Sequence, residues 1–460
     1  MNTQKFFILI VITIGLSACT GEHSVFDKNS KYYFDGSISR EVLENYLDRS
    51  VTAGYFLTPG APENYLFPFR EDDIRMLQNI GAKFIGRSIY RWSEESKLGD
   101  PVFLEYGKRL IERMHEYDPE IIFQACIFEW VSADVDKLAI PAWVFEAFDL
   151  PVEKRNFSKA EMVKRIDPNA LAAMSGNCPM VNNIETKLWF YFLAKSYIDI
   201  GIEAFHLGQV NVISRDDPDK THYKEILDRI RDYAKKNARR HYVLLDGHTP
   251  FDGFVKDGIS LLDFNSFPLR IKEVEDRPME GILELGTNDR MYIYSCPTCN
   301  GQIVSGKTLN TTFCPYCGNP MIITDRFYGI YKKSPGAISP SGWEAESMPY
   351  LVEFDNWGMR RNPPPGVANV DDFFCWGYDE ISWFALQEEA YRNQWLWYAF
   401  DWLRETDPNG HLQMCVIRMI SHSDNNNTYR SYFANTKSVA CPVGYSQEET
   451  IKEIWNKRLK

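Results

Sequence analysis

The chain has 460 residues, of which 44% are hydrophobic and 14% aromatic, so it can bury one large core. Its formal net charge is -12 and no basic patch stands out along it, which argues against nucleic acid or an anionic membrane surface as a partner. A single domain with insertions fits this composition at least as well as three small domains, and neutral or weakly charged substrates fit it best.

The first residues have the pattern of an export signal. Lys5 precedes an apolar run that is too short to cross a bilayer and that ends in Leu16-Ser17-Ala18-Cys19. That tetrapeptide resembles the lipobox of bacterial lipoproteins, in which the cysteine is lipidated and becomes the first residue of the mature protein. An ordinary secretory signal with a chance cysteine is the alternative.

The lipobox resemblance implies a signal peptide over 1–18, a lipid on Cys19 and a tether over 19–38. The protein would then sit in the envelope of a Gram-negative bacterium, at the outer membrane or cell surface, and would meet the membrane only through its lipid. The residues leave open whether it faces the periplasm or the outside.

Beyond the tether, strand-like and helical patterns alternate. Eight short apolar runs predict strands, at 51–57, 84–90, 121–128, 203–209, 241–246, 261–267, 350–355 and 412–419. Helical periodicity is found at 71–80, 102–117, 184–200, 223–239, 381–405 and 447–459.

The order strand, helix, strand implies parallel pairing, and eight strands fit an α/β fold of the (β/α)8 TIM-barrel type. Its two parts would be 39–289 and 326–460, separated by an insertion at 290–325. A doubly wound open sheet is the alternative, but no G-x-G-x-x-G follows the first strand.

Polar and aromatic residues gather where these strands end, which in a barrel is the catalytic rim. In strand order from the second to the eighth they are Arg87 and Trp92; Glu129 and Trp130; His206 and Gln209; Asp246 and His248; Asp263 and Asn265; Glu353, Asp355 and Trp357; Arg418 and His422. Each alone could cap a helix or satisfy a neighbour, but as a group they indicate a site.

The seventh strand is the most informative. It leads into Glu353-Phe354-Asp355-Asn356-Trp357, which supplies two carboxylates, an amide and an indole. Two carboxyl groups can divide acid and base work, and a tryptophan face can hold a sugar ring, so this strand end is typical of carbohydrate cleavage. A half-buried strand whose polar side chains simply face water would show the same pattern.

A lipidated barrel with a glutamate at the end of strand seven resembles the glycoside hydrolases of clan A, and the barrel lipoproteins that Bacteroidota deploy on polysaccharides. The resemblance implies that Glu353 is the nucleophile and that a second glutamate, the acid/base, follows strand four. Strand four instead ends in Gln209, and an amide cannot deliver that proton. The proton would then come from Glu129, Asp246 or Asp355.

We therefore expect a glycosidase acting on oligo- or polysaccharide, retaining or inverting. The catalytic residues would be Glu353, Asp355 and Glu129. The expected substrate-binding residues are Arg87, Trp130, His206, Gln209, Asp246, His248, Trp357 and Trp376, the last from the loop after strand seven. A non-catalytic glycan-binding lipoprotein on a barrel scaffold, and a lyase or esterase, are the alternatives.

The insertion contains two C-x-x-C pairs, Cys296/Cys299 and Cys314/Cys317, with the spacing of a rubredoxin-type zinc ribbon. Four thiolates close a tetrahedral shell and leave no position for substrate, so we expect a structural metal, zinc rather than iron. Disulfides are the alternative in an exported chain. Residues 301–308 also satisfy the P-loop pattern, but they link two metal knuckles instead of opening a helix, so we reject a nucleotide site.

Overall fold

The computed structural model describes residues 26–59, 68–167, 176–249, 253–274, 277–283, 292–299, 301–305, 313–325, 334–355, 380–421 and 429–457. The expected signal peptide, the lipidation site Cys19 and the residues Trp357, Trp376 and His422 lie outside these ranges. Within them, no helix has both the length and the apolar character needed to cross a membrane.

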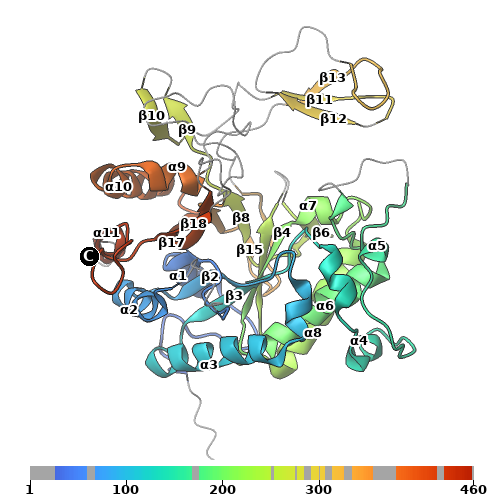
Figure 1. Ribbon diagram of the computed structural model, residues 1–460, viewed down its shortest axis with the longest axis horizontal. Helices are drawn as coiled ribbons and strands as arrows, with labels where there is room; N and C mark the ends of the chain where they lie inside the picture. Colours follow the sequence, from blue (N-terminus) through green and yellow to red (C-terminus); the bar gives the residue numbers. More distant parts are fainter. Residues whose placement is uncertain are drawn as a thin grey trace, which may run out of the picture.

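Eight parallel strands close into a barrel, which confirms the expected TIM-barrel fold (Figure 1). In order they are β1 (Ser50–Ala53), β2 (Phe84–Ile89), β3 (Ile122–Cys126), β4 (Ala204–Gln209), β5 (Leu244–His248), β8 (Asn265–Pro268), β16 (Tyr350–Glu353) and β17 (Gly410–Ser421). Each overlaps one of the eight predicted strands, and the barrel closes because β1 pairs in parallel with β17. An antiparallel strand that the sequence did not predict, β18 (Tyr429–Phe433), pairs with the far end of β17.

Helices surround the barrel. They are α1 (Arg40–Leu47), α2 (Arg70–Ile80), α3 (Pro101–Tyr117), α4 (Ala142–Glu146), α5 (Lys159–Met162), α6 (Ile184–Ile198), α7 (Val210–Ile213), α8 (Thr221–Asn237), α9 (Glu380–Leu386), α10 (Glu389–Thr406) and α11 (Glu448–Lys457), with 3-10 turns η1 (Glu95–Gly99) and η2 (Ala133–Lys137). Local sequence sets their ends: the Asp100 side chain accepts from the Val102 amide at the start of α3, and Gly81, at φ 69°, closes α2.

The prediction of a single long helix over 381–405 is wrong, because two helices, α9 and α10, occupy that range. Glu388 is extended (φ -65°, ψ 148°) and separates α9 from α10. The guanidinium of Arg392 donates to the Gln387 carbonyl, so the break is satisfied by a side chain instead of by the helical ladder.

A second hydrophobic cluster closes the base of the barrel, at the N-terminal ends of the strands. Tyr32, Phe34 and Ile38, from the C-terminal part of the expected tether, are buried there against the first residues of β2 to β5. Phe26 lies against the guanidinium of Arg240, with 4.4 Å from the ring centroid to Cζ. The described N-terminal segment is therefore bound to the end of the barrel opposite the strand ends that carry the candidate site.

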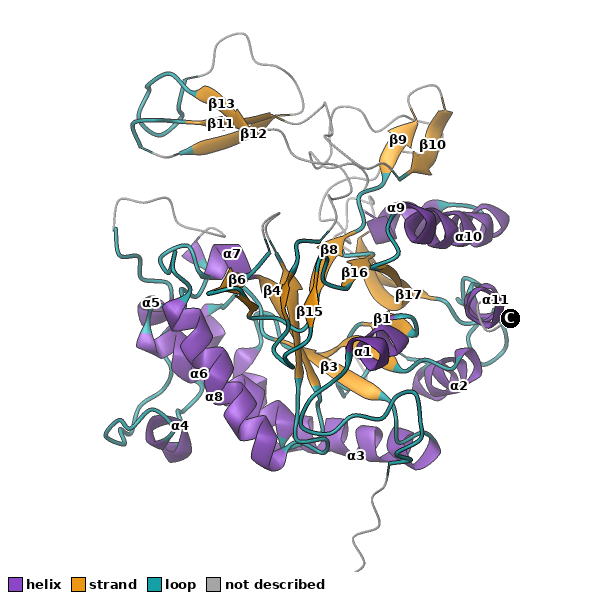
Figure 2. Ribbon diagram, turned by 180° about the vertical axis from the view of Figure 1, so that it is seen from behind, coloured by secondary structure: helices purple, strands orange, loops and turns teal. Residues whose placement is uncertain are grey.

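The insertions lie in two connections, from β5 to β8 and from β8 to β16. A small sheet joins β6 (Val255–Lys256), β7 (Ile259–Ser260), β14 (Ala337–Ile338) and β15 (Glu344–Ala345), and β9 (Lys272–Val274) pairs with β10 (Arg277–Ile282). The ribbon is a separate sheet of β11 (Tyr292–Ser295), β12 (Gln302–Ser305) and β13 (Ile322–Asp325). Figures 1 and 2 show the ribbon and the β9/β10 hairpin above the edge where the barrel strands end.

Candidate active site

Strand periodicity stacks the candidate residues in one column inside the barrel. On β16 Leu351 belongs to the base cluster, and Glu353 and then Asp355 follow at steps of two. On β5 the same steps lead from Leu244 to Asp246 and His248. The interior is therefore apolar at the base and becomes charged toward the rim.

Arg87 enters this interior through an irregularity in β2. The register between β2 and β3 shifts between Ile85 and Ile89, and Arg87 lies in the left-handed region at φ 54°. Alternation would direct Arg87 outward with Ile85 and Ile89, but the irregular backbone turns it inward. Gly86 makes room, since a Cβ there would lie 2.6 Å from the Gln413 amide nitrogen.

Glu353, Asp355, Arg87 and His248 form a buried ionic cluster. One terminal nitrogen of Arg87, Nη2, donates to Glu353 Oε2, and the other, Nη1, lies 2.8 Å from Asp355 Oδ1. His248 Nε2 lies 3.0 Å from Glu353 Oε2. The side chains of Arg87 and Glu353 are 4% and 1% exposed, so water screens this pair little.

The cluster fixes the charges of its members. Burial raises the pKa of Glu353, but the Arg87 guanidinium and the hydrogen bond from His248 outweigh it and hold that pKa well below its usual range. The pKa of Asp355 is lowered in the same way, against burial, by Arg87, His248 and Arg418. Burial lowers the pKa of His248, but the two carboxylates raise it overall. Both carboxyl groups are therefore held ionised.

Asp246 fixes the tautomer of His206. Its Oδ2 lies 2.7 Å from His206 Nδ1 and accepts from Ser266 Oγ at 2.7 Å, while Oδ1 accepts from the Gln124 amide at 2.5 Å. A carboxylate with these donors accepts the proton of Nδ1, which leaves Nε2 of His206 as an acceptor. That nitrogen lies 3.3 Å from Arg87 Nη2.

Glu129 is held at the end of the fourth strand by Gln209. The backbone and side-chain amides of Gln209 donate to its two carboxylate oxygens at 3.1 and 3.2 Å. Gly208, at φ 59°, is required here, because a Cβ on it would lie 1.8 Å from Glu129 Oε2. A carboxyl group from the third strand thus reaches the place where the fourth strand itself offers only an amide.

An aromatic ridge runs outward from the ionic cluster. The ring of His206 packs edge-on against Phe128 with 6.0 Å between centroids, and Phe128 lies 5.1 Å from Trp92. Trp92 is 37% exposed, so the ridge ends in an open indole face. Trp130, expected to stack on substrate, is half-buried, whereas the ridge is built on Trp92 and Phe128.

The expected site residues separate into two groups. The first group lies together inside the barrel and consists of Arg87, His206, Asp246, His248, Glu353 and Asp355, with Arg418 donating to Asp355. In the second group, Gln209 pairs with Glu129. Asp263 faces away, accepting from the Leu245 amide at 2.8 Å. Gln124 and Ser266 were not among the predicted site residues, although both follow the inward alternation of their strands.

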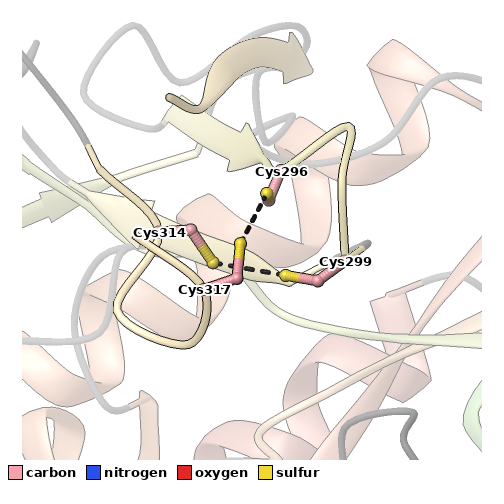
Figure 3. A group of neighbouring side chains, drawn as sticks. All are labelled: Cys296, Cys299, Cys314 and Cys317. Atoms are coloured by element: carbon pink, nitrogen blue, oxygen red, sulfur yellow. Dashed lines mark hydrogen bonds between the residues drawn. The ribbon is translucent and has the colours of Figure 1, made fainter. Parts of the chain in front are cut away.

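The four ribbon cysteines converge as their spacing predicted (Figure 3). Their sulfurs all lie within 4.8 Å of one another, with 3.4 Å between Cys296 and Cys317 and between Cys299 and Cys314. A metal with arms of about 2.3 Å needs tetrahedral sulfurs about 3.8 Å apart, so the set fits one ion. All four are free thiols, and Gln302–Ser305 of the P-loop-like segment is a ribbon strand.

Comparison with solved structures finds distant overlaps. No protein-family model matches the sequence, and no curated protein matches it. Structures that overlap with it include a debranching enzyme from Nostoc punctiforme (TM-score 0.30, 13% identity, 51% of this chain and 53% of that one) and an α-galactosidase from Thermus thermophilus (0.30, 16%, 52% and 48%). A GH27 β-L-arabinopyranosidase from Geobacillus stearothermophilus gives 0.26, 13%, 45% and 50%.

The chain thus spans about half the length of each of these enzymes. At such TM-scores the overlaps do not bear on what this chain does, so its function is argued from its own residues.

Proposed function

We propose that this barrel is a glycoside hydrolase that acts on an oligo- or polysaccharide. The observation that carries the proposal is the placing of two carboxyl groups at the rim. Glu353 stands at the end of the seventh strand, and Gln209 binds the Glu129 carboxylate at the end of the fourth. These are the two places where the clan A enzymes, which the chain resembles in its layout, have their catalytic glutamates.

Glu353 would act as nucleophile or general base. Its lowered pKa keeps it a carboxylate near neutral pH, as either role requires. Arg87 and His248 bind Oε2, while Oε1 has no hydrogen-bond partner among the described residues. Oε1 is therefore the oxygen that could attack a sugar carbon or take a proton from water.

Glu129 is a better proton donor than Asp355. The pKa of Asp355 lies below its usual range, so Asp355 holds no proton to give near neutral pH. Glu129 is only partly buried and is bound by an amide side chain that can adjust to a protonated carboxyl group.

The ridge of Phe128 and Trp92 would hold the sugar. An aromatic face stacks on the apolar face of a pyranose and needs no charge, which suits a neutral substrate. The donors and acceptors of His206 and His248 would bind its hydroxyl groups.

The remaining parts of the proposal concern placement and stability. Lipidation of Cys19 would anchor the protein in the cell envelope, and the tether would meet the barrel at its base, because Tyr32 and Phe34 are buried there. The site would then open away from the lipid. A zinc ion in the four-cysteine set would order the ribbon without taking part in chemistry.

One observation favours a second function, glycan binding without cleavage. The side chain of Glu353 is only 1% exposed, and a nucleophile must reach the anomeric carbon. A barrel that binds sugar on the aromatic ridge and uses the ionic cluster only for stability would have the same arrangement of side chains as a hydrolase.

Calorimetry against a glycan panel, run beside a reducing-end assay on the same glycans, separates the two functions. The proposal expects new reducing ends from at least one glycan that binds. Binding without product from any of them would contradict the hydrolase and leave the binding protein.

A further inference from the structure

Three side chains at the centre of the rim form a set that could hold a metal ion. His206, His248 and Glu353 each offer one ligand atom, and these atoms lie within 4.8 Å of one another. Ligand atoms on opposite sides of one ion lie roughly 4.2 Å apart when the arms are about 2.1 Å, so atoms within this limit are near enough to share an ion. Two imidazoles and a carboxylate are a ligand set that several divalent transition metals accept.

The surroundings of His206 also match those of a metal ligand. Metal-bound histidines usually give their other ring N–H to a carboxylate, which fixes the tautomer. His206 has this partner in Asp246, at 2.7 Å from Nδ1, and its Nε2 is thereby left free to donate electrons. Asp246 is itself held by Gln124 and Ser266, so the arrangement is rigid.

The centre of this set is already filled by Arg87. Its Nη2 lies 3.3 Å from His206 Nε2 and 3.4 Å from His248 Nε2, and it donates to Glu353 Oε2. Nη1 binds Asp355 at 2.8 Å. A guanidinium keeps its positive charge at any pH that the protein meets, so a dication could enter only against direct repulsion.

We propose that Arg87 takes the place of a metal ion in this site. It is a positioning residue: its two terminal nitrogens bind Glu353 and Asp355 side by side, and Nη2 donates an N–H to His206 Nε2. The strained backbone supports this role, because Arg87 adopts φ 54° in the middle of a buried strand, at the irregularity where its side chain turns inward. The inference does not depend on the glycosidase function.

Arg87→Gly tests the proposal directly. Glycine accepts a positive φ without strain, so this variant removes the guanidinium and leaves the three ligands around a free position. Mn²⁺ is the probe, followed by electron paramagnetic resonance on protein whose ribbon is already loaded with zinc, because Mn²⁺ prefers nitrogen and oxygen ligands to thiolates.

R87G should bind one equivalent of Mn²⁺, and the wild type none at this site. Adding His206→Ala to R87G should abolish binding, and adding Asp246→Asn should weaken it by about 10- to 100-fold, as the loss of an outer-shell carboxylate does. Arg87→Lys, which keeps a cation there, should not bind Mn²⁺. These variants need no enzymatic activity as a readout.

Two results would overturn the proposal. One is Mn²⁺ binding by the wild type that His206→Ala removes, since the site would then be a metal site despite Arg87. The other is a folded R87G, with a wild-type circular dichroism spectrum, that binds no Mn²⁺. If R87G does not fold, ¹⁵N spectra of the wild type provide the test. We expect the guanidinium protons of Arg87 to exchange slowly with water, and their signals are assigned by their absence in R87K. Fast exchange of these protons would contradict the proposal.

Discussion

Glu353 and Arg87 form an ion pair inside the barrel, between the seventh and second strands, with side chains only 1% and 4% exposed. Neither residue can be buried alone, because an unpaired charge in this interior would cost several kcal/mol. The pair therefore connects the candidate chemistry of the rim with the stability of the fold.

The pair predicts how stability depends on pH. The pKa of Glu353 in the folded protein is lower than its ordinary value. The ionised side chain therefore stabilises the fold fully when the pH is above the ordinary pKa, and this stabilisation is lost as the pH falls through the folded pKa. Glu353→Gln should lower the free energy of unfolding by about 3 kcal/mol near pH 7, as the loss of one partner of a buried pair does. Urea titrations at several pH values should show the difference from wild type shrinking as the solution becomes strongly acidic. A difference that does not change with pH would contradict the assigned charge.

Asp246→Asn should disturb the site without touching an acidic residue of the ionic cluster. The amide cannot hold the proton of His206 Nδ1 as the carboxylate does, so the proton moves to Nε2, where it meets the N–H of Arg87. We expect a loss of about 1–3 kcal/mol in stability from the unsatisfied donors. ¹⁵N chemical shifts of the histidine ring report the tautomer, and an unchanged Nδ1–H form in D246N would refute the argument. Ser266→Ala, which leaves the His206 contact intact, is the control.

A buried carboxyl group outside the site gives a pH effect of the opposite sign. Burial raises the pKa of Asp73 on α2 to about 7, against the lowering effects of Arg70 and Asn435. Since the folded pKa lies above the unfolded one, the wild type should lose stability as the pH rises from about 4 to 7, by a few kcal/mol. Asp73→Asn should remove this loss and be the more stable protein at pH 8.

Its neighbour Asp72 supplies the control for that experiment. The pKa of Asp72 is lowered, because Arg75 and Asn435 outweigh burial, so Asp72→Asn should cost stability at neutral pH and little in acid. Thermal unfolding between about pH 2 and 8 should therefore give opposite trends relative to wild type: D73N gains stability as the pH rises from about 4 to 7, and D72N recovers stability as the pH falls below about 4. Parallel trends would show that Asp73 titrates normally.

The ribbon should bind one zinc ion per chain and unfold independently of the barrel. Its small core of Tyr294, Cys296, Cys314 and Met321 is separate from the barrel core. Cys314→Ser should abolish zinc binding, measured by metal analysis and by a zinc-sensitive dye after thiol modification. The ribbon should then become sensitive to protease, while the thermal unfolding transition of the barrel stays at the same temperature. Cys126→Ser, at a buried thiol of the barrel, is the control for loss of a cysteine. Retention of a full equivalent of zinc by C314S would contradict the four-cysteine site.

The barrel itself could be predicted from the sequence because each strand is a short apolar run and most are separated by clear helical periodicity. The alternation of β16 and β5 also predicts that Glu353, Asp246 and His248 face one interior. The inward turn of Arg87 could not be predicted, because it depends on a local irregularity and a left-handed residue that no pattern in β2 marks. The contact between Glu129 and Gln209 joins the carboxyl ends of two neighbouring parallel strands, and pairing across strands is not encoded in the spacing of either one.

The most direct test of the proposed function is the rate of reducing-end release by Glu353→Gln on a glycan that the wild type cleaves. We predict that turnover falls by about 10²- to 10⁴-fold, because the amide can neither attack nor take a proton, while calorimetry still shows the glycan bound. Glu161→Gln, at an exposed surface carboxylate, should cleave at the wild-type rate. Turnover by E353Q within a fewfold of wild type would contradict the central role of Glu353.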